Sequence, residues 1–406
     1  MDRFLIGMLM QPIKEELLLS DTQLGFLTGI AFAFFYATLG IPIARWADRG
    51  NRLTIISIAM ALWGGMVMLC SVVTNFLQLA LVRIGAAVGE AGCLPPAYSL
   101  IGDYFSVPER TRAFAIYMSG VSISIVISSS LAGWINELYG WRVAFLLIGA
   151  PGLLMAILVK VTLSEPRQYV DKQLESQEPP QRLSEVLIAL WRQRTFRRLI
   201  IALTLVNFVG MGLGQWLPAF YIRNYGIATG ELGLWIGLVG GMSGVMGTLC
   251  GGYLLDRYLA DSIQKQMWCI AIGVGFLVPI YWLLLFTSDR SLALLLMCPL
   301  NILFSFFYGP VMGLIQRLVE DKTRAMAIAT VGLILNLVAM GLGPQVVGII
   351  SDWLTPIMGT ADSLRFAMAI AAVVSFGSVY YFWVVGRTID HDLETIEDKK
   401  SDLVLG

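Results

Sequence analysis

Four charged side chains lie within stretches of the sequence that are otherwise apolar: Asp2, Arg3, Arg83 and Glu90. Loss of water favours the neutral, protonated form of a carboxyl group, whereas a nearby guanidinium favours the charged form. When the distance to the arginine changes, the carboxyl group can therefore take up or release a proton. This pattern predicts a proton switch, with Glu90 and Asp2 as proton carriers and the two arginines as the opposing charges.

The same residues allow a plainer interpretation, in which a permanently charged pair holds two helices together. Arg83 and Glu90 are seven residues apart, which places them on one face of a helix, about 10 Å apart along its axis. They can share one network without touching each other. The single histidine, His391, lies in a polar segment near the end of the sequence and offers no second proton site.

The last part of the chain contributes polar and aromatic side chains inside its apolar runs. Amides in such runs either pack between helices or line a cavity, and the sequence leaves both alternatives open. Together with Arg3 and Arg83, the residues that we expect in a substrate and charge network are Asn207, Gln215, Trp216, Asn301, Phe304, Tyr308 and Asn336.

Apolar runs of helical length must position these residues. Of the 406 residues, 57% are hydrophobic and only 14% are charged, which excludes a soluble globular protein. A helix of about 20 apolar residues spans a bilayer. Eleven such runs are present, at residues 21–44, 53–74, 76–102, 112–135, 142–163, 199–222, 230–255, 266–287, 291–315, 325–350 and 364–386.

The start of the sequence is too short to span a membrane before polar residues begin. Residues 1–10 precede Lys14, Glu15 and Glu16, and ten residues of helix rise about 15 Å, half of a hydrocarbon core. We expect the sequence to begin part-way through a first helix. The alternative is a short N-terminal segment that lies in the membrane interface.

The basic residues indicate how the helices are oriented. If residues 160–198, residues 387–406 and every alternate loop with its helix ends face the cytoplasm, that side carries 21 of the 28 Lys and Arg residues and the opposite side carries five. Cytoplasmic loops are the ones enriched in Lys and Arg. The sequence thus predicts a protein of the cell membrane, meaning the inner or plasma membrane, with its linker and C-terminal tail in the cytoplasm.

An internal repeat divides the chain into two halves. The segment ERTRAFAI at residues 109–116 recurs as DKTRAMAI at residues 321–328, an offset of 212 residues. Asp48 and Asp256, each followed by arginine, are 208 residues apart. Parallel repeats of this kind are a known architecture of membrane transporters.

The repeat and the long polar segment together predict the domain organisation. We expect an N-terminal bundle of helices 1–6 at residues 1–163, with helix 1 partial, and a C-terminal bundle of helices 7–12 at residues 198–387. A cytoplasmic linker at residues 164–197, which includes an amphipathic helix, joins them. Residues 388–406 form a cytoplasmic tail.

The segment ARWADRGNR, residues 44–52, resembles the loop signature of the major facilitator superfamily, G-x-L-x-D-R-x-G-R. Asp48, Arg49 and Arg52 match that signature, whereas alanine replaces its first glycine and Asn51 the later one. The resemblance implies an all-α membrane protein with the major facilitator fold, made of two pseudo-symmetric six-helix bundles.

Three motifs resemble the spinster branch of that superfamily, the lysolipid transporters. Asparagine at position 51 is typical of this branch, as are the Asp2-Arg3 pair in the first helix and RIGAAVGEAG at residues 83–92. The branch resemblance implies a lysophospholipid or a phosphorylated sphingoid base as cargo.

The superfamily uses the signature loop as a cytoplasmic gate. Asp48 could face the start of the eleventh helix and Asp256 the start of the fifth, because carboxylates stabilise helix N-termini. The alternative is ordinary loop charge that Arg49 or Arg257 neutralises. The gate residues that we expect are Asp48, Arg49, Arg52, Asp256, Arg257, Arg112 and Arg324.

The motifs leave secondary transport as the leading function. The sequence has no G-x-x-x-x-G-K-[ST] loop, no Ser/His/Asp or Cys/His set and no cysteine spacing typical of a metal site. An enzyme is therefore not expected, nor is a cofactor, and a proton gradient would supply the energy. With a net charge of zero, nucleic acid is not an expected partner.

We therefore expect a monomer in the bilayer that moves a lipid-like substrate by alternating access. The runner-up is a proton-coupled carrier of small organic anions or drugs. A third alternative is a membrane receptor or sensor that does not transport.

Overall fold

The computed structural model describes residues 2–166, 191–319 and 324–405, which are almost entirely helical. In this part of the chain, ten helical stretches are long and apolar enough to cross a membrane, and the last, Met326–Asp390, covers two of the predicted runs. The all-α membrane fold and the eleven predicted apolar helices are thus confirmed. Most of the linker, including most of its predicted amphipathic helix, lies outside the described residues, as do the side chains of residues 391–406, which include His391.

The first half of the chain forms a series of helices, and polar side chains cap the N-termini of several of them. Ser20 accepts a hydrogen bond from the N–H of Gln23, and Asn51 accepts one from Thr54. Asn51, one of the two residues that depart from the superfamily signature, is thus the N-cap of the next helix. The elements are α1 (Asp2–Leu17), α2 (Asp21–Thr28), α3 (Ile30–Arg49), α4 (Arg52–Leu69), η1 (Cys70–Val72), α5 (Phe76–Ala91), α6 (Leu94–Tyr104), α7 (Val107–Tyr139) and α8 (Trp141–Thr162).

The first helix extends beyond the apolar residues with which the sequence begins. α1 continues through Pro12 and ends at Leu17, so that Lys14 lies in its last turn. Lys and Glu are good helix formers, and this explains why the polar residues continue the helix instead of ending it. Leu18 then adopts a left-handed backbone with φ 52°, and the chain turns into α2.

The last half repeats the pattern with long helices. Its elements are α10 (Arg194–Tyr225), α11 (Thr229–Leu234), the π-helical η4 (Trp235–Gly240), α12 (Gly241–Tyr258), α13 (Ile263–Phe286), α14 (Arg290–Phe306), α15 (Tyr308–Arg317), α16 (Arg324–Ile334), the π-helical η6 (Leu335–Leu342), α17 (Gly343–Ala372) and α18 (Ser375–Leu405). α17 contains a sharp turn at Gly359, whose φ of 79° favours glycine.

Interruptions occur at corresponding places in the two halves. The break between α2 and α3 lies at Gly29, and the π-helical η4 contains Gly237, 208 residues later. The break between α5 and α6 corresponds to the one at Phe307 between α14 and α15. Helix breaks and π-helical turns mark places where a helix can bend. The repeat seen in the sequence is therefore also a repeat of helix interruptions.

The chain folds into two compact units that do not coincide with its two halves. Unit 1 comprises Met1–Glu178, Gln215–Gly241 and Pro344–Leu364; unit 2 comprises Pro179–Gly214, Met242–Gly343 and Arg365–Gly406. Unit 1 thus contains the first half of the chain together with segments from the last half. The predicted division into bundles at residues 1–163 and 198–387 stays a prediction.

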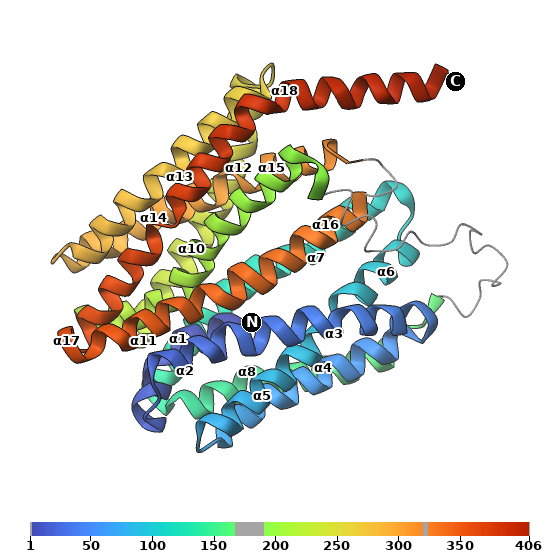
Figure 1. The fold of residues 1–406 in the computed structure, drawn as a ribbon. Helices are drawn as coiled ribbons and strands as arrows, with labels where there is room; N and C mark the ends of the chain where they lie inside the picture. The colour runs from blue at the N-terminus through green and yellow to red at the C-terminus, as the bar shows by residue number, and fades with distance from the viewer. Residues whose placement is uncertain (1, 167–190, 320–323, 406) are drawn as a thin grey trace. The chain divides into compact units, whose positions relative to one another are not determined.

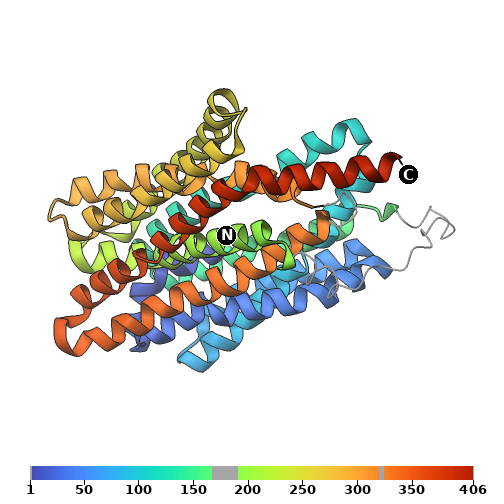
Figure 2. The same ribbon diagram turned by 45° about the horizontal axis from the view of Figure 1, so that its top comes forward.

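Each unit is a bundle of packed helices. In unit 1, α4 packs against α5 and α8, and α3 lies beside α5, as Figures 1 and 2 both show. In unit 2, α13 packs against α14 and α18. Many apolar side chains nevertheless face outwards, among them Ile157 at 64% and Leu249 at 67% exposed.

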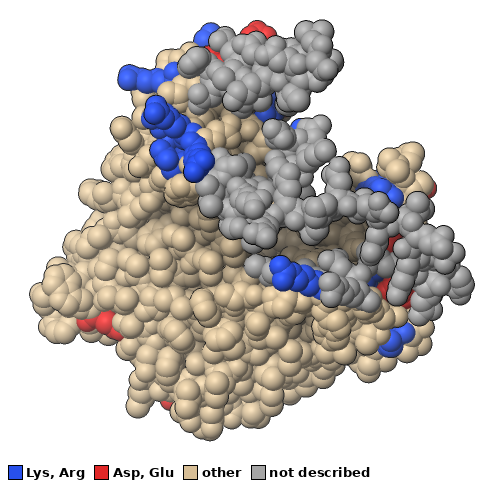
Figure 3. All heavy atoms as spheres, turned by 45° about the vertical axis from the view of Figure 1, so that its right-hand side comes forward, with Lys and Arg blue, Asp and Glu red and all other residues tan. Residues whose placement is uncertain are grey.

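The surface agrees with a protein that sits in lipid. On the face shown in Figure 3, most of the surface carries no charged side chain, and the charged residues form small groups. Monomeric soluble proteins rarely expose large contiguous apolar patches. The outward-facing apolar side chains therefore fit a hydrocarbon environment.

Candidate functional site

Two of the four charged residues of the apolar segments, Arg3 and Glu90, form an ion pair. Nη2 of Arg3 in α1 lies 2.7 Å from Oε1 of Glu90 in α5, and the two side chains keep 23% and 27% of their surface exposed. The sequence left the arginine partner of Glu90 open, and the structure places Arg3 there. A partly exposed pair of this kind joins two helices and still lies within reach of water.

Aromatic rings surround the arginine of this pair. The guanidinium carbon of Arg3 lies 4.5 Å from the ring centroid of Phe32 and 4.6 Å from that of Tyr36. Arg83 is buried, and its guanidinium carbon lies 5.1 Å from the same Phe32 ring. Cations over ring faces are stabilised by the ring quadrupole. Phe32 therefore contacts both arginines and places them in one site.

Glu90 occupies the last turn of α5, immediately before the chain breaks into α6. The N–H of Cys93 donates to the carbonyl of Glu90 at 3.1 Å, a tightened end of the helix. Pro95 and Pro96 follow in α6, and proline has no N–H to continue the α5 hydrogen-bond ladder. A change of charge on Glu90 thus acts next to a place where the backbone can bend.

Three further predicted residues are Asp2 of the first helix and Gln215 and Trp216 of α10. The side chain of Asp2 lies outside the described residues. Gln215 donates its amide N–H to the carbonyl of Arg3 at 3.4 Å, so it belongs to the same site. Trp216 is fully buried and donates to the carbonyl of Pro344 at 2.9 Å. In this structure it packs against α17, and its place in the substrate and charge network stays a prediction.

The predicted amides of unit 2 turn back onto their own helices. Asn207, Asn301 and Asn336 each donate to the carbonyl four residues earlier, at 2.8 Å. Asn207 is buried, whereas the other two are partly accessible. Phe304 packs against Gly210, and Tyr308 is 45% exposed just after the break in its helix. The contacts described for each of these residues lie within unit 2.

Arg52, predicted for the gate, is the buried centre of a group that we call the Arg52 cluster, in which Glu165 is buried and Asp103 is 41% exposed. Its guanidinium lies 2.5 Å from the carboxylates of Asp103 and Glu165, and it donates to the Ser99 hydroxyl at 2.8 Å. Its backbone N–H also donates to Glu165 at 2.7 Å. All these partners belong to the first half of the chain. The Arg52 cluster therefore ties the start of α4 to α6 and to the segment that follows α8.

The remaining predicted gate residues are at the surface or outside the description. The side chains of Asp48 and Arg49 lie outside the described residues. Arg112, Asp256 and Arg257 are exposed, and the guanidinium of Arg257 lies 5.8 Å from the ring of Tyr253. Arg324 donates to the carbonyl of Gln316 at 3.2 Å. The gate assignment of these residues stays a prediction.

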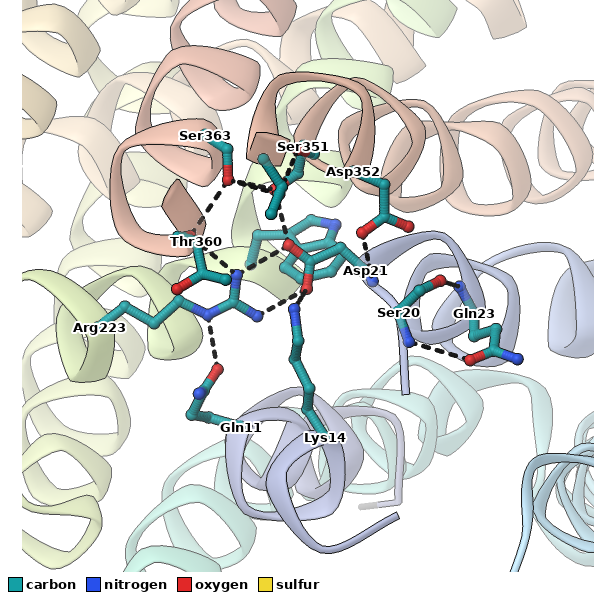
Figure 4. Close-up of polar contacts among 12 residues, drawn as sticks. Gln11, Lys14, Ser20, Asp21, Gln23, Arg223, Ser351, Asp352, Thr360 and Ser363 are labelled. Carbon is teal, nitrogen blue, oxygen red and sulfur yellow. Dashed lines mark hydrogen bonds and ion pairs between the residues drawn. The ribbon is translucent and has the colours of Figure 1, made fainter. Parts of the chain in front are cut away.

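A second buried group, the Asp21 cluster, was not predicted from the sequence (Figure 4). It comprises Lys14, Asp21, Arg223, Ser351 and Asp352. The Asp21 carboxylate is fully buried, and both its oxygens accept from Arg223, at 2.7 and 2.8 Å. Lys14 lies 2.5 Å from one oxygen, and the Ser351 hydroxyl donates to the other at 2.6 Å. One carboxylate thereby holds α1, α2, α10 and α17 together.

The backbone at the start of α2 takes part in the same cluster. The N–H groups of Asp21 and Thr22 donate to the two carboxylate oxygens of Asp352, at 2.9 and 2.7 Å. Arg223 also donates to Gln11, at 2.6 Å. Figure 4 shows Arg223 and Lys14 approaching Asp21 from different elements. The cluster joins residues that are up to 331 positions apart in the sequence.

The residues that the sequence did not reveal share one property. They lie at or beyond the ends of the long apolar runs: Asp21, Asp103, Glu165 and Asp352. Charged residues are common at such positions in any membrane protein. A weak signal was present: Asp21 directly follows the N-cap Ser20 and opens an apolar run. That signal predicts a helix start and not an ion cluster, because the partners come from distant parts of the chain.

Comparison with known proteins agrees with this architecture. The family model described as Major Facilitator Superfamily matches residues 1–344. The chain is 31% identical over 395 residues to an MFS-type efflux pump of Mycolicibacterium smegmatis, covering 97% of this chain and 90% of that protein. It is 24% identical over 405 residues to a probable L-galactonate transporter of Escherichia coli strain K12, covering 96% and 87%.

The structure is also similar to solved structures. A bacterial homolog of the human lysosomal transporter Spinster, in an inward-facing and unoccupied conformation, superposes with a TM-score of 0.87 at 29% identity. The alignment covers 96% of this chain and 94% of that one. The resemblance to the spinster branch noted in the sequence motifs is thus confirmed over almost the whole chain.

Proposed function

We propose that this chain, which belongs to the major facilitator superfamily, is a proton-coupled secondary transporter of an amphipathic lysolipid or phosphorylated sphingoid-type substrate. The observation that carries the proposal is the ion pair of Arg3 and Glu90, 2.7 Å apart between α1 and α5. Transport proceeds by alternating access, in which the two halves of the chain expose the site first to one side and then to the other.

Proton binding acts on this ion pair directly. A proton on Glu90 removes the negative charge, and the attraction that ties α1 to α5 is lost. Arg3 keeps its charge and its contacts with Phe32 and Tyr36. Because charged side chains within a membrane are costly without a partner, the freed guanidinium then favours an anion.

The neighbourhood of Arg3 suits a substrate that is anionic at one end and apolar along the rest. A guanidinium binds phosphate through charge-assisted hydrogen bonds, and the rings beside it provide apolar surface. Similarity to the Spinster homolog and to an efflux pump supports this choice. The substrate and the ionised Glu90 carboxylate compete for the same arginine, so that a proton on Glu90 favours substrate binding and couples the two movements.

The Asp21 cluster supports a gate on the outer side of the membrane. The positive-inside orientation puts Lys14 and Arg223 at the outer ends of their helices. The cluster connects α1 and α2 of the first half with α10 and α17 of the last half. Opening towards the outside requires these contacts to separate. We propose that the described conformation has this gate closed.

The rest of the functional assignment follows from the same orientation. We propose that the protein lies in the inner or plasma membrane as a monomer, with the linker and the C-terminal tail in the cytoplasm. Its partners are the bilayer and the substrate. The proton gradient supplies the energy, and neither an enzymatic reaction nor a cofactor is part of the proposal.

A second candidate is a proton-coupled carrier of small organic anions or drugs. The similarity to the probable L-galactonate transporter favours it, since a carboxylate could also pair with Arg3. A receptor or sensor without transport is the third alternative. Transport by the purified protein separates the third from the first two, and competition between substrates separates those two.

The decisive experiment is uptake into proteoliposomes under an imposed pH gradient. We expect a fluorescent lysolipid to be redistributed by the wild-type chain and by Glu15→Gln, a control on an exposed carboxylate that accepts from Gln11. Glu90→Gln should bind the lysolipid but no longer respond to the gradient. Gradient-driven transport that galactonate inhibits and excess lysolipid does not inhibit would favour the organic-anion carrier. Absence of any gradient-driven movement by the wild type would overturn both transport assignments.

A further inference from the structure

The start of α2 is held by a carboxylate from the other half of the chain. Both oxygens of Asp352 in α17 accept backbone N–H groups from the first turn of α2, at 2.9 and 2.7 Å. α2 also has its own capping box, in which Ser20 and Gln23 satisfy each other's backbone N–H groups. Since α2 is already capped locally, it does not need Asp352 in order to form. It connects two helices that are far apart in the sequence.

The start of α11 is held in the same way, with the halves exchanged. A carboxylate oxygen of Glu137, near the end of α7, accepts the N–H of Gly230 at 2.9 Å. Asn136 donates to the hydroxyl of Thr229 at 3.0 Å. The residue before this helix is Ala228, which makes no side-chain cap. A carboxylate of the first half thus caps the start of α11, which has no local side-chain cap.

The two arrangements are related by the internal repeat. Thr229, the first residue of α11, follows Asp21, the first residue of α2, by 208 residues, the same offset as in the repeated loop motif. Gly25 and Gly233 have this offset too. A Cβ at Gly25 would lie 2.7 Å from the carbonyl oxygen of Pro344, and one at Gly233 would clash with the carbonyl of Ser129. Each helix therefore packs closely beside the segment that supplies its carboxylate.

We propose that Glu137 and Asp352 are a pair of pseudo-symmetric latches that close the outer side of the transporter. Each carboxylate of one half accepts from the first turn of a helix of the other half, two N–H groups at Asp352 and one at Glu137, and both contacts separate when the outer side opens. The inference rests on the proposed alternating access, because it needs a state in which α2 leaves α17 and α11 leaves α7.

Helix N-termini suit a contact that must break repeatedly. A carboxylate there contributes about 0.3 to 2 kcal/mol, which corresponds to a roughly 2- to 30-fold change in an equilibrium. When the latch opens, water can hydrate both the N–H groups and the carboxylate. Two latches of this strength bias the closed state without locking it.

The test measures how fast cysteines in the two contact regions react with a membrane-impermeant maleimide applied from outside. In a chain whose five native cysteines are replaced by serine, single cysteines at Ser130 and at Gln345 report on the two latches, because Ser130 contacts Gly233 and Gln345 contacts Thr22. We expect Glu137→Ala and Asp352→Ala each to raise labelling about 2- to 30-fold. The increase should occur at both reporters, since the halves open as bodies.

Matched variants separate a latch from local loosening. Asp289→Ala removes a carboxylate that caps the start of its own helix α14, and it should leave both reporters unchanged. Glu137→Gln and Asp352→Asn keep an acceptor oxygen and should give smaller increases than alanine. The thermal midpoint of the purified protein should change little, because opening does not unfold the helices.

Three results would overturn the inference: labelling that rises only at the reporter beside the altered residue, an equal rise in Asp289→Ala, or a rise that appears only with loss of folded protein. The assay needs neither substrate nor proton gradient. A failed latch therefore leaves the transport proposal standing, and a failed transport assay leaves the latches to be judged by labelling alone.

Discussion

Two buried arginines, Arg52 and Arg223, have nearly the same chemistry and different consequences. Each pairs with a buried carboxylate, Glu165 in one case and Asp21 in the other. The described partners of Arg52 all belong to the first half of the chain, whereas Arg223 of the last half binds Asp21 of the first half. A contact within one half braces that half in every state. Under the alternating access that we propose, a contact between halves exists in only one state, so it can regulate the movement.

The two clusters also differ in what their desolvated charges do for the protein. A buried ion pair contributes little net stability, because desolvation offsets the attraction, but removal of one partner is strongly destabilising. In the Arg52 cluster that penalty appears as unfolding, since the bundle offers no other arrangement. In the Asp21 cluster the remaining charges can reach water when the outer side opens. The penalty there appears as a shift of conformation.

The largest effect is expected at the brace. Arg52→Met should lower the free energy of unfolding by about 3–5 kcal/mol, because the buried carboxylate of Glu165 loses its partner. Chemical or thermal unfolding in detergent measures the change. The double variant Arg52→Met, Glu165→Leu should recover most of the loss, because apolar replacement of a buried ion pair is often neutral and the exposed Asp103 carboxylate can be hydrated. A single variant as stable as the wild type would contradict the assigned role.

The second prediction concerns the contact between the halves. Asp21→Asn leaves Lys14 and Arg223 without their common carboxylate, and opening lets both cations be hydrated. We expect the outward-open population to rise about 10- to 100-fold, in line with coupling energies of about 1–3 kcal/mol, while the unfolding midpoint changes less than in Arg52→Met. Spin-label distances between the outer ends of α2 and α17 measure the shift. A large loss of stability with unchanged distances would make Asp21 a brace as well.

The difference between the two clusters also shows how far the sequence could lead. Arg3 and Glu90 were predicted because a charge inside a long apolar run is costly and needs a reason. The eleven apolar helices followed from the lengths of the runs. Asp21 and Glu165 carry no such signal, since they stand where helices meet polar surroundings.

Pairing between distant residues was the part that could not be derived. The amino-acid sequence contains Arg223 and Asp21 as two ordinary helix-end charges, 202 residues apart. Only the packing of α2 beside α10 and α17 makes them partners. For the same reason Arg52 matched a gate motif by type and position, although its described partners brace the first half.

A third prediction tests the contact surface below the Asp21 cluster. Gly25→Val places side-chain atoms against the backbone of Pro344, so the closed contact between α2 and α17 is obstructed while α2 itself stays helical. We expect a shift towards the outward-open state of several-fold, at most about 2 kcal/mol, because overpacking costs about 1–3 kcal/mol and opening relieves part of it. Gly65→Val, at a glycine with open space around it, is the control in the same half. Equal labelling of outer-side reporter cysteines in both variants would count against a closing contact at Gly25.

The smallest effect is expected at a surface brace, where pH provides the handle. Glu16 in α1 accepts from Arg142 at 2.7 Å and from the indole N–H of Trp141 at 2.6 Å in α8. Partial burial raises the pKa of Glu16, but these hydrogen bonds and the charge of Arg142 outweigh it and hold the pKa below its usual value. A carboxyl group with a lowered pKa in the folded state stabilises the fold above its unfolded-state pKa, and this contribution is lost as the pH falls through the folded-state pKa.

Because both partners are largely exposed, with 47% and 33% of their side chains accessible, the contribution is only about 0.2–1 kcal/mol. Glu16→Gln should therefore lower the unfolding free energy slightly at pH 7 and by less at about pH 3, below the ordinary glutamate pKa, with the effect disappearing fully only below the lowered folded-state pKa. High salt should reduce the difference at pH 7, since exposed pairs are screened. A destabilisation of the same size at both pH values would mean that packing of the Glu16 side chain matters and its charge does not. In that case the α1–α8 contact would differ from both arginine clusters, because it would hold its helices together without ionic attraction.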